Sequence, residues 1–579
     1  MTSIAKLNAM SAPQFVETLS SIWERSPWVP ERAAAMRPFG AVLDLHSAMS
    51  SVVFDATLDE QLALIRAHPQ LAGREAIRGE LTPNSTREQH GAGLDACSPE
   101  EVSRLAQLNS AYVDRFGFPF VLAVKGHNRS SILDQLQRRL GNTLEAERTE
   151  ALHQISRIAA FRLLDLVEEG AGPRINSMAE HLARFSESEA SLTCSYLTPA
   201  HRATARQLRD WMLASGLTVE MDAVGNIIGR LQGAAPGAGT LLTGSHYDTV
   251  VDAGKFDGRL GILLPITVVS QLRREGIRLP YTLKIIAFAE EEGVRFKSTF
   301  LGSRALAGRF DPALLDSLDK DGISMADALR AAELEPDPRK IAAAALDPGE
   351  LLGFVEVHIE QGPTLLEAGQ ALGVVTSIAG SIRSVVSVTG SAGHSGTVPM
   401  HLRRDAAAGA AEIVLAVERR CSGTPGLVGT VGQLNVPGGA INVIPGRCEL
   451  SVDIRSGEDS VRDAAFSDVK AECERIGERR GLGVEWRKVL EINSVPCANR
   501  MQQRWADSIH AVTGVDAYRL PSGAGHDAMV MAEVTEIGML FVRCGNGGIS
   551  HSPLETLSEA DADSAARAFR DFLLSFTPA

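Results

Sequence analysis

The sequence lacks the features of a secreted or membrane-spanning protein. Its 7 cysteines are odd in number and no two form a CxxC pair, which argues against a disulfide framework or a zinc–thiolate site and favours a reducing compartment. The start MTSIAKLNAM has no apolar secretory core, no run is apolar enough to span a bilayer, and the end SFTPA carries no retention or peroxisomal signal. We therefore expect a cytoplasmic protein.

The sequence also lacks an excess of basic residues. The net charge of −14 argues against nucleic acid or an anionic membrane as a partner, so we expect small-molecule substrates. We find no internal repeat and no low-complexity tract. The 579 residues, 44% hydrophobic and 22% charged, predict an ordinary globular protein of two to four domains.

The pattern of apolar residues predicts several domains. Residues 1–168 repeat apolar residues at three- and four-residue spacing, which predicts an all-α domain. Residues 169–175 contain Gly and Pro and are expected to form a linker. Helical stretches alternate with buried-strand runs in 176–383 and again in 496–579, which predicts one α/β domain. Between them, 384–495 predicts an inserted α+β domain with strand–helix–strand–strand–helix–strand order, as in ferredoxin-like folds.

Five metal-ligand residues lie in short, glycine-marked motifs. The motifs are GSHYDTVVDAGKFDG, AFAEEEGVRF, EVHIEQG and GISHSPLE, and the residues are His246, Asp257, Glu292, His358 and His551. One histidine alone is more often structural than a ligand. Five such residues at strand ends and Gly-rich turns instead predict two divalent metal ions that share a carboxylate. A metal pair supplies both the nucleophile and the charge stabilisation that hydrolysis of an unactivated C–N bond requires.

Two acidic residues beside these ligands have predicted supporting roles. Asp248 follows His246 by two residues and can hydrogen-bond the second ring nitrogen of that histidine. Glu291 precedes the ligand Glu292, and adjacent side chains diverge, so Glu291 is the candidate general base.

The ordered motifs GSHYDT…FDG, AEEEGVRF, LGSR, HIEQG, GHSGTVPM…RRD, INVIPG…DIR, SGAGHDA and GISHSPLE resemble the M20-type amidohydrolases that cleave N-carbamoyl groups. That family includes N-carbamoyl-L-amino-acid hydrolases, β-ureidopropionase and allantoate amidohydrolase. The resemblance covers about residues 176–579. It implies one metal on His246, Asp257 and His358, another on Asp257, Glu292 and His551, and Glu291 as the base. Two small departures are Glu290, where Asn is common, and Tyr247, where Leu is common.

The same resemblance implies further substrate contacts and a homodimer formed through the inserted domain. His394 would reach the active site of the partner subunit and polarise the scissile carbonyl. Asn442 and Arg455 would hold the substrate carboxylate, and Gln361 would add a weaker polar contact. His526 would either line the site or support a ligand. Without the resemblance, His394 reads as a loop histidine and Arg455 as a surface strand residue. Zinc is the default ion for these ligands, with manganese as the alternative.

The N-terminal part carries a second set of motifs: AHPQLAG, ELTPNSTREQHGAGL and NSAYVDRFGFPFVLAVKG. They resemble 2-oxo-4-hydroxy-4-carboxy-5-ureidoimidazoline (OHCU) decarboxylase, a small all-helical enzyme of urate breakdown, over about residues 7–167. The resemblance implies His68 as the acid/base and Glu88 as an orienting residue, without any cofactor. The residues implied to bind the substrate are Ser85, Gln89 and Arg162. Histidine suits proton transfer near neutral pH. From the residues alone, His68-Pro69 is typical of a turn that ends a helix. STREQ is equally typical of a capping box that starts a helix, with Ser85 as the N-cap and Glu88 at the third position.

Taken together, the two resemblances predict a bifunctional enzyme of purine catabolism. The N-terminal half would convert OHCU to (S)-allantoin, and the C-terminal half would hydrolyse allantoate to ureidoglycine, ammonia and CO2. A ring-opening hydrolase outside this chain would act between the two steps. The alternatives for the C-terminal half are an N-carbamoyl-L-amino-acid hydrolase and a ureidoglycolate hydrolase. A hypothesis of another class is that the N-terminal half is a non-catalytic scaffold.

Overall fold

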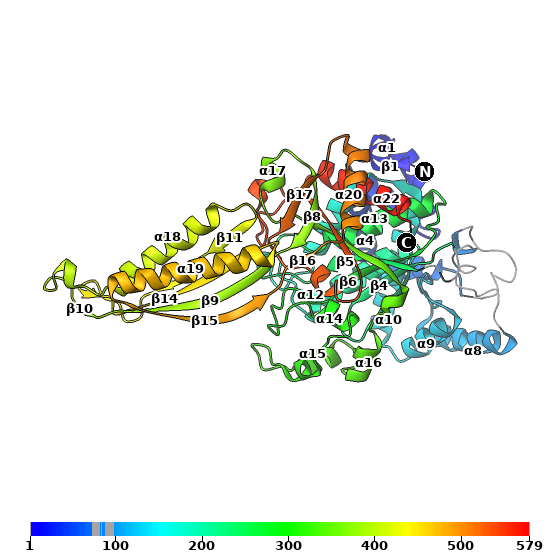
Figure 1. Cartoon of the computed structure of the whole chain (residues 1–579). Coiled ribbons are helices and arrows are strands. Elements are labelled where there is room, and N and C mark those ends of the chain that lie inside the picture. Colours follow the sequence, from blue (N-terminus) through cyan, green and yellow to red (C-terminus); the bar gives the residue numbers. More distant parts are fainter. Residues whose placement is uncertain are drawn as a thin grey trace.

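The computed structural model describes residues 2–577, apart from 72–81, 83, 87, 89–97, 235, 236 and 238. Gln89, a predicted substrate-binding residue, lies outside the described residues. Figure 1 shows a rounded body from which one elongated arm projects. Within the described residues, no helix is both long and apolar enough to cross a bilayer.

Helices make up nearly all of the described N-terminal part. They are α1 (Ile4–Ala9), α2 (Ala12–Leu19), α3 (Trp28–Ala33), α4 (Val42–Phe54), α5 (Leu58–Arg66), α8 (Pro99–Phe116), α9 (Arg129–Arg139) and α10 (Leu144–Leu166). Capping boxes start α5 at Thr57 and α8 at Ser98. Large aromatic side chains such as Trp23, Tyr112 and Phe120 are buried in the core of this unit. The strands β1 (Thr2–Ser3) and β2 (Val167–Glu168) pair in parallel, a contact that the sequence did not indicate.

Residues 169–175, predicted to be a linker, are mostly helical, because helix α11 (Ala171–Ala183) begins at Ala171. Pro173 lies in the first turn, where a helix tolerates proline. Gly172 lies so close to α22 that a Cβ atom there would be 2.0 Å from the carbonyl oxygen of Glu559. Packing of α11 on α13 and α22 therefore outweighs the local Gly and Pro signal.

A nine-stranded sheet forms the centre of the body, in the order β16-β8-β18-β7-β5-β6-β4-β3, with β17 paired to β8. The strands are β3 (Thr218–Met221), β4 (Ile227–Leu231), β5 (Thr240–His246), β6 (Thr282–Phe288), β7 (Leu351–Ile359), β8 (Leu372–Ile378), β16 (Val495–Pro496), β17 (Tyr518–Ser522) and β18 (Ile537–Val542). The four central strands β18, β7, β5 and β6 are parallel. β5 is buried along its whole length, as a central strand of an α/β sheet should be.

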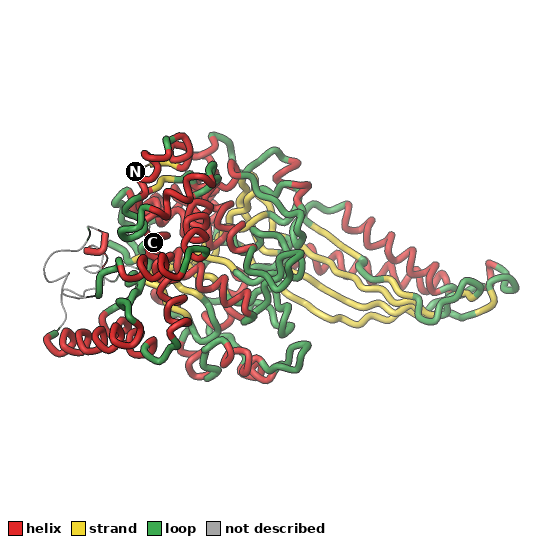
Figure 2. The backbone as a smooth tube through the Cα atoms, turned by 180° about the vertical axis from the view of Figure 1, so that it is seen from behind, coloured by secondary structure: helices red, strands yellow, loops and turns green. Residues whose placement is uncertain are grey.

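Helices enclose this sheet, as Figure 2 shows from behind. The long ones are α11, α12 (Pro199–Ala214), α13 (Leu260–Arg274), α20 (Asn499–Thr513) and α22 (Glu559–Ser575); the short ones are α14 (Leu301–Leu306), α15 (Met325–Ala331), α16 (Pro338–Ala343), α17 (Thr364–Glu367) and α21 (Asp527–Met531). The N-terminal unit docks on this layer through charged contacts. Arg157 pairs with Asp210 at 2.6 Å and Arg273 pairs with Asp165 at 2.5 Å.

The arm is a separate sheet with two helices. It contains β9 (Gly380–Thr389), α18 (Ala406–Ser422), β11 (Leu427–Thr430), β14 (Arg447–Ser456), α19 (Asp459–Arg480) and β15 (Gly483–Ile492). Its antiparallel strands lie in the order β11-β14-β9-β15, with β12 (Leu434–Asn435) paired to β14. Alternate residues of β14 are buried, so one face of the sheet packs on the helices. At the tip, β10 (Gly393–His394) pairs with β13 (Val443–Ile444).

Candidate functional site

The sheet topology brings the predicted metal ligands to one edge. His246 is the last residue of β5, Glu291 and Glu292 follow the end of β6, and His358 lies near the end of β7. These neighbouring strands are parallel, so their carboxyl ends meet at the same edge, which is where open α/β sheets place their sites. The loop after β5 adds Asp257.

The first ligand group consists of His246, Asp257 and His358, all buried. Nε2 of His358 lies 3.3 Å and Nε2 of His246 lies 3.9 Å from Oδ1 of Asp257. Nδ1 of His358 is 2.8 Å from the carbonyl oxygen of Ile359, so Nδ1 carries the proton and Nε2 a lone pair. Oδ1 of Asp257 is buried without a hydrogen-bond donor. Two imidazole nitrogens and one carboxylate oxygen thus converge, so these residues fit a divalent metal ion.

The second ligand group shares Asp257 and adds Glu292 and His551. Nε2 of His551 lies 3.0 Å from Oδ2 of Asp257 and 3.5 Å from Oε1 of Glu292. Oδ1 of Asp257 therefore faces the first ligand group, and Oδ2 faces the second. Nε2 of Gln361 donates to Oδ2 of Asp257 at 3.0 Å and lies 3.3 Å from Nε2 of His551. The structure thus brings Gln361 to the edge of this group.

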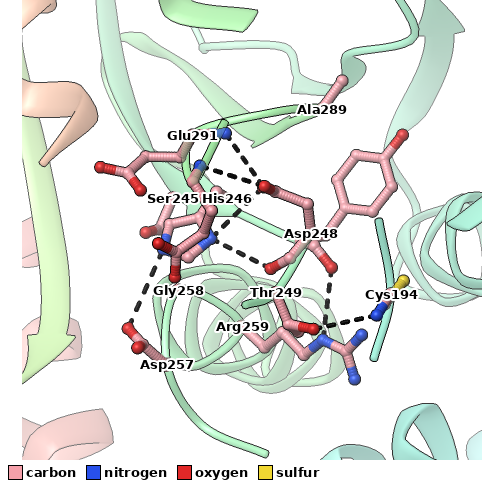
Figure 3. Close-up of polar contacts among 12 residues, drawn as sticks. Cys194, Ser245, His246, Asp248, Thr249, Asp257, Gly258, Arg259, Ala289 and Glu291 are labelled. Atoms are coloured by element: carbon pink, nitrogen blue, oxygen red, sulfur yellow. Dashed lines mark hydrogen bonds and ion pairs between the residues drawn. The ribbon is translucent and has the colours of Figure 1, made fainter. Parts of the chain in front are cut away.

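Asp248 joins the end of β5 to the turn after β6. Its carboxylate accepts the backbone N–H groups of Glu291 and Glu292, each at 3.1 Å, and lies 3.5 Å from Nδ1 of His246. Figure 3 shows Asp248 between the ring of His246 and the backbone of Glu291. Asp248 is fully buried. It can therefore orient His246 and hold the acidic turn in place.

Glu291 lies beside the first ligand group, within a cluster that also contains His246 and Glu292. Burial raises the pKa of Glu291 well above its usual range; nearby His246 opposes this shift and Glu292 adds to it. A carboxyl group that holds a proton more tightly than usual is suited to general acid–base work. Glu290 is fully buried and neither of its oxygens has a partner among the described residues.

A cavity of about 550 Å³ lies in the N-terminal unit. His68, Ser85, Glu88 and Arg162 line it, as does the backbone segment 120–126. Arg162 donates to both oxygens of Glu88, at 2.8 and 2.9 Å. Nδ1 of His68 lies 3.0 Å from the carbonyl oxygen of Leu64, which leaves Nε2 for a substrate. Burial lowers the pKa of His68 to about 4, so the ring is neutral at pH 7.

Glu24 lies beside this cavity and joins its charged cluster, although no sequence motif contains it. Its Oε2 accepts from Nη1 of Arg162 at 3.0 Å and from Oγ of Ser85 at 3.2 Å. Arg162 therefore lies between two carboxylates. Glu24 is separated from Arg162 by 138 residues and lies outside the motifs, so only tertiary structure could reveal it.

Comparison with known proteins identifies the larger part of the chain. Residues 242–575 match the family model of peptidase family M20/M25/M40. The chain belongs to this family. Residues 8–164 match the family model of OHCU decarboxylase. The protein is thus an enzyme in which an OHCU decarboxylase domain precedes an M20 hydrolase domain.

Individual relatives agree with this assignment. Allantoate deiminase of Arabidopsis thaliana is 38% identical, over 68% of this chain and 80% of its own length. N-carbamoyl-L-amino acid amidohydrolase of Geobacillus stearothermophilus is 40% identical, over 63% of this chain and 88% of its own length. Among solved structures, a hydantoinase/carbamoylase family amidase of Burkholderia ambifaria is 30% identical, with a TM-score of 0.64, and covers 70% of this chain and 98% of its own.

A buried layer supports the ligands of the M20 domain from behind. The ring centroid of His526 lies 4.5 Å from that of His358, and Nε2 of His526 lies 2.8 Å from Oγ of Ser522. Glu356 accepts from Oγ of Ser245 at 2.6 Å and lies in a cluster with His358 and His526. Glu356 is not among the residues predicted from the sequence. Its place two residues before His358, on the same face of β7, could have revealed it.

The remaining predicted residues lie in the arm and are not joined to the metal ligands within one chain. His394 and Asn442 are exposed at the tip, where the N–H of Ser395 donates to the Asn442 carbonyl at 3.0 Å. Figure 1 shows β10, which contains His394, at the far end of the arm. Arg455 ends up at the base instead, where it pairs with Asp453 and donates to the carbonyl of Gly523, both at 2.8 Å. Asn442 and Arg455, which were predicted to bind the substrate carboxylate together, therefore lie at opposite ends of the arm, Asn442 at the tip and Arg455 at the base.

Proposed function

We propose that the enzyme decarboxylates OHCU to (S)-allantoin and hydrolyses allantoate to ureidoglycine, ammonia and CO2. The observation that carries the proposal is the presence, in one chain, of the ligand groups around Asp257 and the cavity around His68. The relatives named allantoate deiminase support allantoate as the substrate of the M20 domain. We also propose that the enzyme acts in the cytoplasm.

The hydrolytic step uses the carboxyl edge of the sheet. Two divalent ions, zinc or manganese, would be held by the two groups that share Asp257; when bound they polarise the ureido carbonyl and lower the pKa of a water molecule. Glu291 accepts a proton from the attacking water and passes it to the leaving nitrogen. The C–N bond breaks, ureidoglycine leaves as the amine, and the carbamate that remains decomposes to ammonia and CO2.

We further propose that a second copy of the chain completes this site. The exposed position of His394 and Asn442 at the end of the arm supports the proposal, because neither residue belongs to a metal-ligand group among the described residues of its own chain. His394 would polarise the ureido oxygen of the partner's substrate. Arg455 would break its ion pair with Asp453 and bind the substrate carboxylate instead, since a guanidinium group can form two hydrogen bonds with a carboxylate.

The decarboxylation step uses the neutral ring of His68. Arg162 holds the Glu88 carboxylate in a fixed orientation toward the cavity. Loss of CO2 leaves a carbanion that is conjugated with the ring of the substrate. His68 takes a proton from the substrate and delivers it to one face of that carbanion, which makes the product a single enantiomer.

Steady-state assays of the full chain test both activities. We expect circular dichroism to show (S)-allantoin forming from OHCU without added metal. We also expect ammonia release from allantoate after addition of Zn²⁺ or Mn²⁺, and its loss on chelation. No turnover of allantoate with either metal would refute the hydrolase assignment. The second candidate is N-carbamoyl-L-amino-acid hydrolysis, which the 40% identical relative favours. Faster ammonia release from N-carbamoyl amino acids than from allantoate or ureidoglycolate would select it.

A further inference from the structure

Lys125 gives the decarboxylase cavity a cation that none of the described carboxylates pairs with. In the part of the chain that the structure describes, the charged residues that line this cavity, apart from histidine, are Glu88, Lys125, Arg162 and Asp165. Arg162 pairs with Glu88 and also with Glu24, and Asp165 pairs with Arg273. Among the described residues, no carboxylate lies within ion-pair distance of Nζ of Lys125, although Glu88 and Asp165 are near enough to act on it electrostatically.

The M20 domain holds this lysine in place. Nζ of Lys125 donates to the carbonyl oxygen of Ala214 at 2.9 Å, and Ala214 is the last residue of α12. Carbonyl groups in the last turn of a helix lack partners within the helix and carry partial negative charge, so they attract an ammonium group. On the decarboxylase side, Nζ lies 5.3 Å from the ring centre of Phe161, which also lines the cavity.

The cavity wall around Lys125 is built against the same helix. Gly126 has a φ of +83°, and a Cβ atom there would lie 2.3 Å from Cδ2 of Leu213. Leu213 belongs to α12, yet it is buried in the hydrophobic core of the N-terminal unit. Arg273 of α13 approaches the wall from the M20 side and neutralises Asp165. The M20 domain thus contacts the cavity wall at three places.

We propose that Lys125 binds the carboxylate of the anionic ureide in the decarboxylase cavity, and that the end of α12 in the M20 domain positions it. The inference rests on the proposed decarboxylase function and adds a substrate contact to it. An anion that leaves water for a partly apolar cavity requires a compensating charge. Lys125 supplies this charge, because Arg162 is already shared by two carboxylates.

Substitution of Lys125 in the full-length enzyme tests the contact. With OHCU as the substrate, Lys125→Met should raise KM about tenfold or more, as expected for loss of a charge-assisted hydrogen bond, and should change kcat less than about threefold. Lys125→Arg should keep KM within about threefold of the parent. The matched control Lys6→Met replaces an exposed lysine of the same domain and should change nothing. Ammonia release from allantoate checks that each variant is folded.

The outcomes separate the inference from the function on which it rests. An unchanged KM in Lys125→Met, or a fall in kcat alone, would overturn the role of Lys125 while decarboxylation by the parent stands. No decarboxylation by the parent would instead overturn the proposed function. A second test uses the pH dependence of decarboxylation: burial and nearby Arg273 lower the pKa of Lys125 to about 8. In the parent, kcat/KM should fall as pH rises through about 8, and Lys125→Arg should abolish that fall.

The contribution of the M20 domain has its own test. Arg273→Ala leaves the Asp165 carboxylate in the cavity wall without its partner, so it should raise KM for OHCU a few-fold and leave ammonia release unchanged. Arg309→Ala is the matched control, because Arg309 also pairs with a carboxylate on the M20 surface, that of Glu533, but not at the cavity. Equal KM values in the two variants would refute the influence of the M20 domain on this cavity.

Discussion

Asp248→Asn should weaken metal binding without removing any metal ligand. The Asp248 carboxylate accepts two backbone N–H groups, those of Glu291 and Glu292, and faces Nδ1 of His246. Asparagine keeps one acceptor oxygen, so one buried N–H loses its partner, at a cost of about 1–3 kcal/mol in the free energy of unfolding. Loss of the carboxylate opposite a ligating histidine typically lowers metal affinity about 10- to 100-fold. Both effects should appear in the same variant.

The assay is competition for Zn²⁺ between the metal-free protein and a chromogenic chelator, combined with urea unfolding. Asp222→Asn is the matched control. Its partly buried carboxylate accepts the backbone N–H groups of Val224 and Asn226 through Oδ1, at 3.0 and 2.9 Å, and the side-chain amide of Asn226 through Oδ2, at 2.7 Å, and neither partner is a predicted metal ligand. The control should lose a similar amount of stability and keep its Zn²⁺ affinity. Equal Zn²⁺ affinities in both variants and the parent would refute the role of Asp248.

Three further predictions concern single side chains. Glu291→Gln should lower ammonia release about 10²- to 10⁴-fold, the usual effect of losing a general base, with Zn²⁺ affinity within a few-fold; an unchanged rate would identify another base. His68→Asn should lower decarboxylation by a similar factor and leave ammonia release intact. The pKa of His68 is lowered to about 4 in the folded state and is about 6.5 when unfolded. Protonation of this histidine therefore favours the unfolded state, and the free energy of unfolding falls as pH falls from about 6.5 to 4. The urea midpoints of His68→Asn should lack this part of the pH dependence. Glu147→Gln removes the buried partner of Arg139 and should destabilise the N-terminal unit by about 3–5 kcal/mol, so decarboxylation should disappear at lower urea than hydrolysis.

The convergence of the predicted metal ligands follows from local sequence, because short patterns determine where each residue stands on its strand. β5 and β6 are continuous apolar runs, and the ligand residues stand where each run ends. Parallel pairing then brings those ends together without further information. Helix α11 could not be predicted in this way. Its Gly and Pro indicate a break, and it forms because its apolar face packs on α13 and α22, which are distant in the chain.

Residues that act through contacts between distant segments escaped prediction. Glu24 lies outside the motifs, and Lys125 lies inside NSAYVDRFGFPFVLAVKG, where nothing distinguishes its side chain from a surface charge. Each takes its position from a segment far along the chain, Glu24 from Arg162 and Lys125 from the carbonyl of Ala214. The division of Asn442 and Arg455 between tip and base of the arm has the same origin. Their separation depends on how the arm extends, which no local motif encodes.

The contacts between the two domains show that they are packed together and not merely joined by the chain. Channelling of product from one site to the other is not expected, because the proposed substrates are separated by a ring-opening step that neither domain supplies. The domains nevertheless share a core, in which Leu213 of α12 is buried among residues of the decarboxylase unit. Burial of a leucine side chain stabilises by about 1.5–3 kcal/mol, and the Arg157–Asp210 pair adds a partly buried charged contact. The end of α12 and Arg273 of α13 therefore form part of the scaffold around the decarboxylase cavity, so the contact between the domains is structural and requires no transfer of an intermediate.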